Sequence, residues 1–247
     1  MTDSKPFAGR LALVTGASRG IGAATAEALA AAGAHVILVA RTASALEEVE
    51  DRIHQSGGTA TIAPLDLTQG ESIGKLAAAV LERWKKLDIL VLNAAMLGSL
   101  TPVQDIDAKE YTRILSLNLL ANQALIAAFD PLLRRADQAE VVALTSSVGA
   151  EPRAFWGAYG SSKAALETLL GTYADETAHM KRMRVHVVDP GATRTRMRAL
   201  AFPGEEPERV KPPEAVARAI VELLGGEAPS GRKMRVDEQV APSAAEA

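Results

Sequence analysis

Short apolar runs rich in β-branched residues alternate along the chain with longer segments of helical periodicity. Several of these runs are apolar at successive positions, as expected for strands whose two faces are both covered by helices. The alternation therefore predicts repeated βαβ units around a parallel sheet. We expect strands at 11–15, 35–40, 59–64, 88–93, 140–146, 184–189 and 233–236, and helices at 20–32, 43–56, 69–86, 108–135, 157–181 and 213–225.

The alternation runs without a linker or a change of composition, so we expect residues 1–247 to form a single domain. Its expected architecture is a doubly wound, Rossmann-type α/β fold. A parallel sheet of about seven strands would have helices on both faces and ligands at the carboxyl ends of its strands. The Pro- and Gly-rich stretch FPGEEPERVKPP falls in a predicted mobile substrate loop at 195–213, and residues 238–247 are expected to form a disordered tail.

Composition narrows the classes of function. The net charge of −3 lacks the basic excess typical of nucleic-acid binding. The sequence has no cysteine, which excludes disulfides and thiol catalysis, and its four histidines show no ligand spacing, so no metal site is predicted. The N-terminus is polar, and no run of about 18 apolar residues occurs. We expect a cytoplasmic protein that binds neither nucleic acid nor membrane.

The strongest motif is TGASRGIG at 15–22, which follows the first predicted strand and opens the first predicted helix. Its glycines permit a tight turn, a close approach of the backbone to a pyrophosphate and close packing of the helix, whose N-terminus favours phosphate. A glycine loop alone is weak evidence, but this one has the context that the motif requires. It predicts a dinucleotide site formed by Gly16, Ser18, Arg19, Gly20, Ile21 and Gly22.

The end of the second strand distinguishes between the two dinucleotides. A chain that prefers NAD usually has Asp or Glu there, which accepts hydrogen bonds from the ribose hydroxyls. This chain instead has Arg41 and Thr42, and Arg19 adds a second cation from the glycine loop. Because arginines suit a 2′-phosphate, we expect a preference for NADP(H), with NAD(H) as the second choice. The alternative is that Arg41 is an ordinary solvated residue at a helix start.

Further motifs follow downstream. Tyr159 and Lys163 lie four positions apart in AYGSSK, and DPGATRT occupies 189–195. With the glycine loop, these segments resemble the TGxxxGxG, YxxxK and PGxxxT motifs of the short-chain dehydrogenase/reductase family, in its shorter subtype, over nearly the whole chain. The chain departs from the family at Ala95, where glycine is usual, and lacks the usual glycine pair after the last strand. The resemblance implies cofactor contacts from Asp66, Leu67, Asn93, Ala94, Ala95, Tyr159, Lys163, Pro190, Gly191, Thr193 and Thr195.

The pair Tyr159 and Lys163 has a chemical reason. Hydride transfer to a carbonyl leaves an alkoxide that needs a proton from an acid within hydrogen-bond reach. A phenol has a pKa of about 10, and a lysine ammonium on the same helical face would lower it. The resemblance gives Tyr159 the role of general acid/base, and gives Lys163 the roles of lowering that pKa and holding the ribose hydroxyls.

The resemblance also implies roles for two further polar residues. Ser146, in preference to Ser147, would bind the substrate oxygen. Asn118 would keep a water in a proton path behind Lys163. In isolation, each residue would more often be a turn cap or a side chain bonded to the backbone.

Substrate contacts are expected from both sides of the catalytic pair. Beside Ser146 and Tyr159, we expect them from Glu151, Arg153, Trp156 and Met197, with Leu200 and Phe202 in the same stretch as Met197. An equally favoured alternative is that Phe155 and Trp156 pack against the sheet or a partner subunit. Proteins that look like this one usually assemble as tetramers, so we expect a homotetramer or a homodimer.

The sequence thus favours an NADPH-dependent oxidoreductase that acts on a carbonyl or a secondary alcohol. A non-catalytic NADP(H)-binding redox sensor is the alternative, although its signature would be loss of Tyr159 or Lys163. An epimerase or dehydratase of the extended subtype shares YxxxK, but it normally needs a C-terminal substrate domain for which this chain has no room. Neither the fold nor the cofactor site identifies the substrate.

Overall fold

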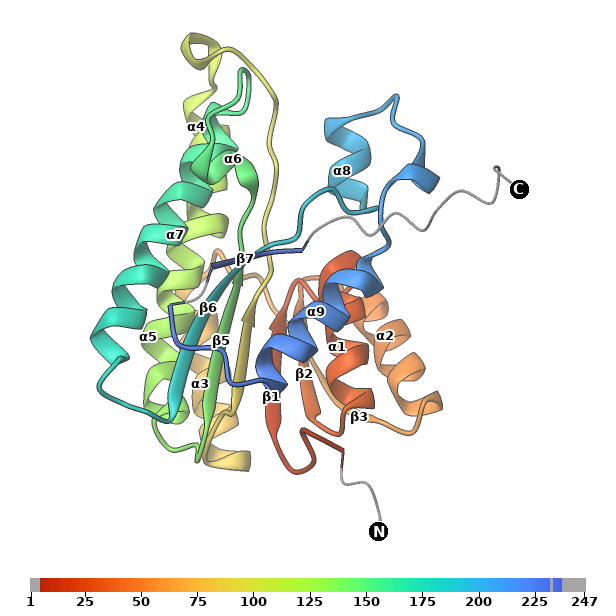
Figure 1. Cartoon of the computed structure of the whole chain (residues 1–247), viewed down its shortest axis with the longest axis vertical. Coiled ribbons are helices and arrows are strands. Elements are labelled where there is room, and N and C mark those ends of the chain that lie inside the picture. Colours follow the sequence, from red (N-terminus) through yellow and green to blue (C-terminus); the bar gives the residue numbers. More distant parts are fainter. Residues whose placement is uncertain (1–4, 232, 237–247) are drawn as a thin grey trace.

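The protein is built on one seven-stranded parallel sheet (Figure 1). The computed structural model describes residues 5–231 and 233–236, so the predicted tail at 238–247 lies outside the described residues. The strand order is β3-β2-β1-β4-β5-β6-β7. The strands are β1 (Leu11–Thr15), β2 (His35–Ala40), β3 (Thr59–Pro64), β4 (Ile89–Leu92), β5 (Ala139–Leu144), β6 (Met183–Asp189) and β7 (Lys233–Arg235).

The order of the strands reverses at the centre of the sheet. β1 pairs in parallel with β2 on one side and with β4 on the other, so the chain crosses over after β3. At such a switch point the loops that follow two neighbouring strands diverge and leave a crevice at their carboxyl ends. The crevice of this fold is therefore expected beyond Thr15, the last residue of β1.

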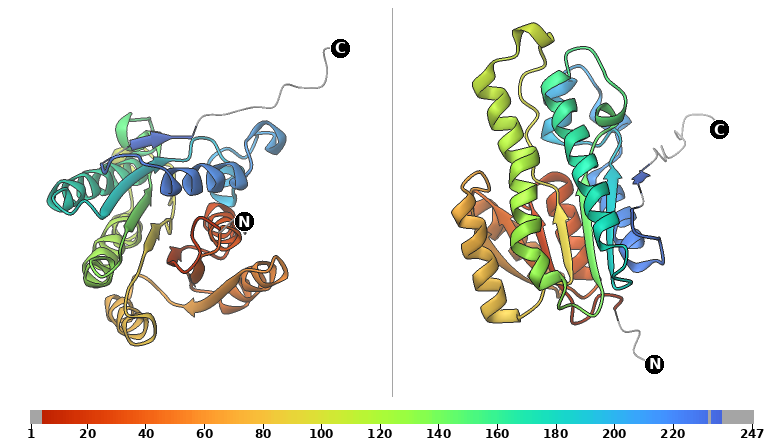
Figure 2. Two further views of the ribbon diagram at one scale, coloured as in Figure 1. Left: turned by 60° about the horizontal axis from the view of Figure 1, so that its bottom comes forward. Right: turned by 90° about the vertical axis from the view of Figure 1, so that its left-hand side faces the viewer.

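Helices cover both faces of the sheet (Figure 2). α3 (Gly70–Trp84), α5 (Ala121–Leu133) and α7 (Gly157–Thr177) pack on one face through residues such as Val80, Phe129 and Leu170. α1 (Gly20–Ala31), α2 (Ala43–Gln55) and α9 (Pro213–Gly225) pack on the other. α2 shows why: its apolar residues recur at helical spacing, and Leu46, Val49 and Ile53 are its buried residues.

Several local elements depart from the sequence-based expectations. The predicted helix 108–135 is α4 (Ala108–Leu115) and α5, joined by a π-helical turn, η2 (Ser116–Leu120). β5 ends at Leu144, two residues earlier than expected, and a short helix, α6 (Ser147–Ala150), follows it. The predicted substrate loop contains α8 (Arg196–Ala201) and the 3-10 turn η3 (Pro207–Arg209), and a further 3-10 turn, η1, spans Val103–Asp105.

The helical stretch Ala108–Leu133 is long and apolar enough to cross a membrane, with a mean hydropathy of 1.2. Core helices of soluble proteins pass the same test. Here Leu125 and Phe129 belong to the core, and the side chain of the buried Asn122 donates to the carbonyl of Asn118. The stretch is thus weak evidence for a membrane span.

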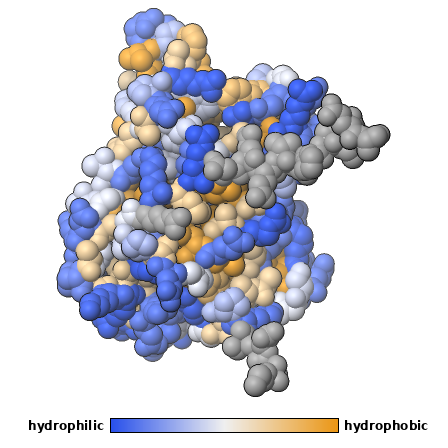
Figure 3. All heavy atoms as spheres, viewed as in Figure 1, coloured by the Kyte–Doolittle hydropathy of each residue, from blue (hydrophilic) through white to orange (hydrophobic). Residues whose placement is uncertain are grey.

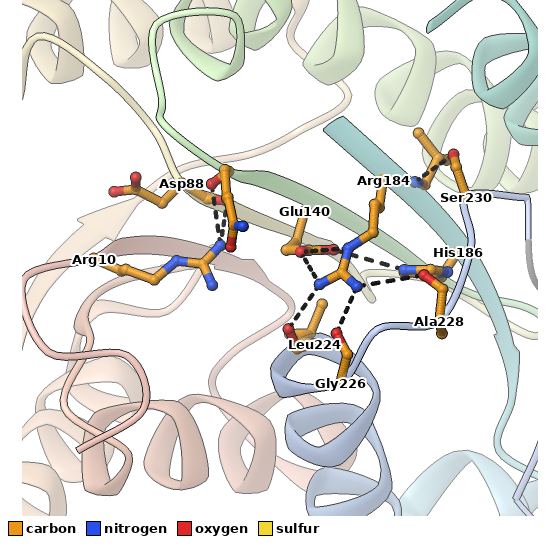
Figure 4. Close-up of polar contacts among 11 residues, drawn as sticks. Arg10, Asp88, Glu140, Arg184, His186, Leu224, Gly226, Ala228 and Ser230 are labelled. Atoms are coloured by element: carbon orange, nitrogen blue, oxygen red, sulfur yellow. Dashed lines mark hydrogen bonds and ion pairs between the residues drawn. The ribbon is translucent and has the colours of Figure 1, made fainter. Parts of the chain in front are cut away.

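The amino end of the sheet holds a buried charged network (Figure 4). Glu140, on β5, accepts a 2.9 Å hydrogen bond from Nε of Arg184, on the neighbouring β6. Arg184 also donates to the carbonyls of Leu224, Gly226 and Ala228, which follow the end of α9 or close it. His186 is fully buried, with Nε2 3.6 Å from Glu140 Oε2. This network ties β5, β6 and α9 together.

A second part of the same network joins β1 to β4. Asp88 Oδ2 accepts a 2.8 Å hydrogen bond from the amide of Leu11, and Lys86 forms a 2.9 Å ion pair with Oδ1. Arg10 donates to the carbonyl of Asp88, and desolvation is the main reason that its pKa lies below the usual value. The amino ends of four strands are therefore cross-linked by side chains.

Candidate active site

The glycine loop has the geometry that the motif predicts. Gly16 and Gly20 have φ angles of +66° and +57°, in the region that favours glycine. A Cβ at Gly22 would collide with the carbonyl oxygen of Gly16, so α1 can begin this close to β1 only without a side chain there. α1 therefore presents its first turn to the crevice at the switch point.

Thr15 and Asn93 fix the two loops that diverge at the crevice. The Thr15 hydroxyl donates to the carbonyl of Val91 and accepts from the amides of Asn93 and Ala94, at 2.9–3.1 Å. The Asn93 side chain donates to the carbonyls of Thr15, at 2.8 Å, and Gly16. Asn93 thus shapes the predicted cofactor site by holding the glycine loop. Sequence reasoning missed Thr15, although its place as the last residue of β1 was a usable signal.

The structure places the predicted PGxxxT segment opposite the glycine loop. A Cβ at Gly20 would lie 3.5 Å from Cγ2 of Thr195, so the two segments face each other. Asp189 Oδ1 accepts from the amide of Gly191, and Thr193 donates to the carbonyl of Pro190 at 3.0 Å. These bonds hold the segment between β6 and α8 in a fixed turn.

The adenosine end of the predicted site is cationic. Arg41 and Thr42, directly after β2, are exposed, as is Arg19 in the glycine loop. Asp66 accepts hydrogen bonds from the amide and the hydroxyl of Thr68, which lower its pKa, with a smaller contribution from the charge of Arg41. Leu67 is buried and Ser18 and Ile21 are half-buried, while Ala94 and Ala95 lie half-buried after β4. A 2′-phosphate suits this end of the site, because cations replace the usual carboxylate.

Tyr159 and Lys163 lie on the first two turns of α7 and are nearly buried, with 7% and 2% of their surfaces exposed. Lys163 Nζ donates a 2.8 Å hydrogen bond to the carbonyl of Leu144, at the end of β5, and lies 5.7 Å from the centre of the Tyr159 ring. The sheet and the helix thus bring the predicted pair together at the carboxyl end of β5.

Burial acts on both pKa values. Desolvation lowers the pKa of Lys163 to about 8, although Glu167 opposes this change. Desolvation also raises the pKa of Tyr159, and Asp189 adds to the rise. The latter direction is opposite to the lowering expected from the sequence, because burial of the phenol disfavours its charged form and Asp189 adds a like charge. In the protein alone, Tyr159 is a neutral phenol at pH 7.

Ser146 begins the short helix α6, two residues beyond β5. Its carbonyl accepts from the amide of Gly149, and the turn packs closely on α7, since a Cβ at Gly160 would lie 2.8 Å from the carbonyl oxygen of Val148. Ser146 thus lies on a turn held against the helix that carries Tyr159. It is half-buried at the carboxyl end of the sheet.

Asn118 lies in the π-helical turn η2 and is fully buried. Its side chain accepts from the amide of Met96 and donates to the carbonyl of Met96, both at 2.9 Å, and donates to Ser162 on α7 at 3.0 Å. It therefore clamps the loop after β4 to α7. These bonds occupy both polar atoms of the side chain. The water-holding role of Asn118 stays a prediction.

An aromatic and cationic cluster lies next to Tyr159. The Trp156 ring is 6.0 Å from the Tyr159 ring and 5.8 Å from the ring of Phe202, which follows α8. Arg198 stacks on Phe202 with its Cζ 3.7 Å from the ring centre, and also forms an ion pair with Glu205. Trp156 thus contacts both Tyr159 and the predicted substrate loop, and its packing against a partner subunit stays a prediction.

The other predicted substrate residues lie around this cluster. Glu151 and Arg153 are exposed, and the Cζ of Arg153 lies 5.4 Å from the Phe202 ring centre. Met197 is half-buried on α8, while Leu200 and Phe155 are exposed. Phe155 has a φ of +72°, a rare backbone conformation for a bulky residue, directly before Trp156. In the view of Figure 1, the surface of the molecule is polar over much of its area, and apolar residues gather near the middle (Figure 3).

The site combines a cradle for a dinucleotide with a proton donor. Within the residues that the structure describes, no cluster of His, Cys, Asp or Glu has the geometry of a metal site. The polar groups at the carboxyl end of β5 and the start of α7 include a phenol, an ammonium and a serine hydroxyl. Such a set can protonate an oxygen atom and stabilise charge on it.

Comparisons with known proteins agree with this reading of the fold. A family model described as short chain dehydrogenase matches residues 10–206. The uncharacterized oxidoreductase YciK of Escherichia coli K12 is 36% identical over 233 residues, which cover 93% of this chain and 92% of that protein.

Two solved structures are similar over nearly the whole chain. A short chain dehydrogenase from Pseudomonas syringae has a TM-score of 0.91 and 38% identity, over 96% of this chain and 98% of that one. A short chain dehydrogenase from Escherichia coli CFT073, solved in complex with NADPH, has a TM-score of 0.89 and 34% identity, over 96% of this chain and 100% of that one.

Proposed function

We propose that this chain, which belongs to the short-chain dehydrogenase/reductase family, is an NADPH-dependent oxidoreductase that reduces a carbonyl to a secondary alcohol. The observation that carries the proposal is the position of Tyr159 and Lys163, buried at the start of α7 and joined to the carboxyl end of β5 through the bond from Lys163 to Leu144. Family membership makes the chain an oxidoreductase that uses a nicotinamide cofactor. The direction of the reaction and the roles of individual residues are proposals.

The residues of the chain fit an NADP(H) cofactor. The glycine loop has no side chain at Gly16, Gly20 and Gly22, and a Cβ at Gly20 would meet only Thr195. Arg19 and Arg41 would hold the 2′-phosphate, and Lys163 the nicotinamide ribose. The NADPH complex of the Escherichia coli CFT073 relative supports the same cofactor. When bound, the reduced nicotinamide supplies the hydride.

The proton chemistry follows from the burial of Tyr159. A phenol with a raised pKa stays protonated at neutral pH, so it can donate to the alkoxide that forms as a carbonyl is reduced. The hydroxyl of Ser146 would donate to the same oxygen and stabilise its developing charge. Lys163 would steady the resulting phenolate through its positive charge. The neutral phenol is thus in the protonation state that carbonyl reduction needs near pH 7.

The aromatic and cationic cluster next to Tyr159 forms the wall that a substrate would contact. Trp156 and Phe202 provide apolar surface, while Arg153 and Glu151 provide exposed charge of both signs. A substrate with an apolar part next to its carbonyl and a polar part toward solvent would suit this wall. Met197, on α8, would contact the apolar part.

Assembly and location extend the proposal. We expect residues 1–247 to work as one NAD(P)-binding domain in a homotetramer or homodimer in the cytoplasm. The side chain of Leu120, 58% exposed between α4 and α5, is the kind of apolar residue that a partner subunit would cover.

The proposed function is tested with a panel of ketones, aldehydes and quinones, by following the oxidation of NADPH. We expect turnover on at least one class of carbonyl, and loss of that turnover in Tyr159→Phe. NADPH binding is measured separately by fluorescence. Tight binding without turnover across the panel would overturn the proposal in favour of a redox sensor.

A further inference from the structure

Two adjacent residues at the end of β5 hold two successive turns of α7. The carbonyl of Leu144 accepts the hydrogen bond from Lys163, and the hydroxyl of the next residue, Thr145, donates to Glu167 Oε1 at 2.6 Å. Lys163 and Glu167 are four residues apart, so they share one face of the helix. The bonds fix the helix and the strand end in one register, directly before Ser146.

The second carboxylate oxygen of Glu167 forms an ion pair with a residue of β7, the last strand. Lys233, on β7, places its ammonium 2.6 Å from Glu167 Oε2. The Glu167 side chain is 18% exposed and that of Lys233 is 46% exposed, so the carboxylate is largely enclosed while its partner reaches solvent. Glu167 is thus a junction between β5, α7 and β7.

The turn that carries Ser146 rests on this junction. A Cβ at Gly149 would lie 3.2 Å from Glu167 Oε1 and from the amide nitrogen of Ala164, so only glycine lets the turn approach the carboxylate without displacing a neighbour. Since α6 spans Ser147–Ala150, the position of Ser146 depends on the position of this carboxylate.

Charged and titratable groups on several secondary-structure elements surround Lys163 and its partners. On α7 they come from Glu167, with the neutral phenol of Tyr159 one turn earlier. β6 contributes Asp189, which acts on Tyr159 and lies 3.9 Å from Arg235 of β7. β7 also contributes Lys233, through Glu167. Glu167 is therefore the acidic group through which the last strand acts on the lysine.

We propose that Glu167 is a positioning residue of the active site. Its carboxylate holds the Ser146 turn through Thr145 and supplies a negative charge one helical turn from Lys163, and Lys233 of β7 regulates that charge by pairing with it. The inference rests on the proposed function, because it assumes that Lys163 works as an ammonium. Burial alone would favour loss of that proton, and Glu167 opposes the loss.

Four variants separate position from charge. Glu167→Gln keeps an oxygen that can accept from Thr145 but removes the charge, whereas Glu167→Ala removes both. Lys233→Met leaves the carboxylate without its partner, so its charge acts more strongly on Lys163. Glu176→Gln removes a charge from an exposed position near the end of the same helix and serves as the matched control.

The readouts are the pH profile of kcat/KM and the pH dependence of the NADPH dissociation constant. In Glu167→Gln, the alkaline limb of both profiles should move down by about one pH unit. In Lys233→Met it should move up, and Glu176→Gln should match the wild type. Glu167→Ala should also lower kcat several-fold at every pH, a loss that Glu167→Gln rescues because it still anchors the turn.

The outcomes separate the two proposals. Unchanged profiles in both Glu167→Gln and Lys233→Met, or shifts in the same direction, would overturn the role of Glu167 even if the enzyme turns over normally. If the wild type has no turnover, the proposed function fails, and the opposite shifts in NADPH affinity alone decide this inference. If the Glu167 variants do not fold, Lys233→Met decides it, since Lys233 is half exposed: an upward shift supports the role and no shift refutes it.

Discussion

At the amino end of the sheet, the carboxylate of Glu140 bonds to Arg184, whereas at the carboxyl end the ammonium of Lys163 bonds to the carbonyl of Leu144. Both Glu140 and Lys163 are nearly inaccessible to solvent. The first charge is compensated by an opposite charge and adds to the cross-links between strands. The second charge is compensated by the dipole of the Leu144 carbonyl and by the carboxylate of Glu167, and it lies beside the Tyr159 ring.

The difference shows what a buried charge can indicate. A buried ion pair holds two secondary-structure elements together, and removing one partner leaves the other charge uncompensated in a low-dielectric interior. A buried ammonium whose pKa has fallen to about 8 is held in a costly state, and such states gather at functional sites. Burial alone therefore does not distinguish the two ends of the sheet, but the partners of each charge do.

The largest expected effect is on the chemistry of the carboxyl end. Tyr159→Phe removes the proposed acid, so turnover should fall about 10²- to 10⁴-fold, while the free energy of unfolding changes by less than about 1 kcal/mol. Steady-state kinetics and urea unfolding measure the two quantities.

A tyrosine on the same helix provides the control. The hydroxyl of Tyr173 donates a 2.8 Å hydrogen bond to Asp130, far along α7 from the crevice. Tyr173→Phe should keep its turnover and lose about 1.5 kcal/mol of stability. Near-normal turnover in Tyr159→Phe would contradict the mechanism.

The amino end should respond in the opposite way. Glu140→Gln leaves the Arg184 guanidinium without its buried counter-charge, so we expect the free energy of unfolding to fall by about 3 kcal/mol. Arg184 keeps its bonds to the carbonyls after α9, which places the loss at the low end for a broken buried pair. The folded variant should keep the kcat/KM of the wild type. A variant that is fully folded but slow would show that this network reaches the active site.

Removing the charge at the carboxyl end should stabilise the protein. Burial lowers the pKa of Lys163 from 10.5 to about 8, so below pH 8 folding must bury a charged lysine. Because the unfolded chain holds this proton more tightly, the cost is fully present below pH 8 and fades as pH rises from 8 to 10.5. Lys163→Met should therefore gain about 2 kcal/mol at pH 7, and the gain should shrink above pH 8.

This prediction is checked by urea unfolding across pH together with turnover. Lys163→Met should be nearly inactive while it is more stable than the wild type near neutral pH. A variant that is less stable than the wild type at pH 7 would mean that the bond to Leu144 compensates the buried charge, and the contrast between the two ends would disappear.

Much of the fold could be predicted from the sequence, because the central strands, such as β1, β4 and β5, are buried throughout and read as continuous apolar runs. β1, β2 and β3 begin and end at the expected residues. The π-helical turn at Asn118 could not be predicted, since the apolar pattern of the helix continues through it and only tertiary bonds to Met96 and Ser162 hold it. α8 was missed because the loop predicted from the prolines and glycines at 202–213 was extended back to residue 195.

In the candidate site, too, local features could be predicted from the sequence and long-range contacts could not. Local motifs predicted the tight turn at Gly16 and Gly22 and the pairing of Tyr159 with Lys163, because their spacing reflects contacts within one turn or one helix. The contacts of Thr15 and Glu167 join partners that lie far apart in the sequence, so local spacing does not predict them, although the place of Thr15 at the end of β1 was a usable signal. The sign of the change in the Tyr159 pKa also escaped the sequence, because it depends on burial.

The smallest expected effect concerns an exposed arginine at the carboxyl end of the sheet, compared with the arginine in the network at the amino end. Arg184 is tied into a network at the amino end, whereas Arg41 is exposed at the carboxyl end of β2, where a bound 2′-phosphate would be its partner. Arg41→Ala should raise the KM for NADPH about tenfold, leave the KM for NADH unchanged, and leave stability unchanged within about 0.5 kcal/mol. Arg113→Ala, an exposed arginine on α4, is the control and should change neither KM. Equal effects of Arg41→Ala on both cofactors would place Arg41 outside the 2′-phosphate site, and the cation that selects NADPH would then be Arg19.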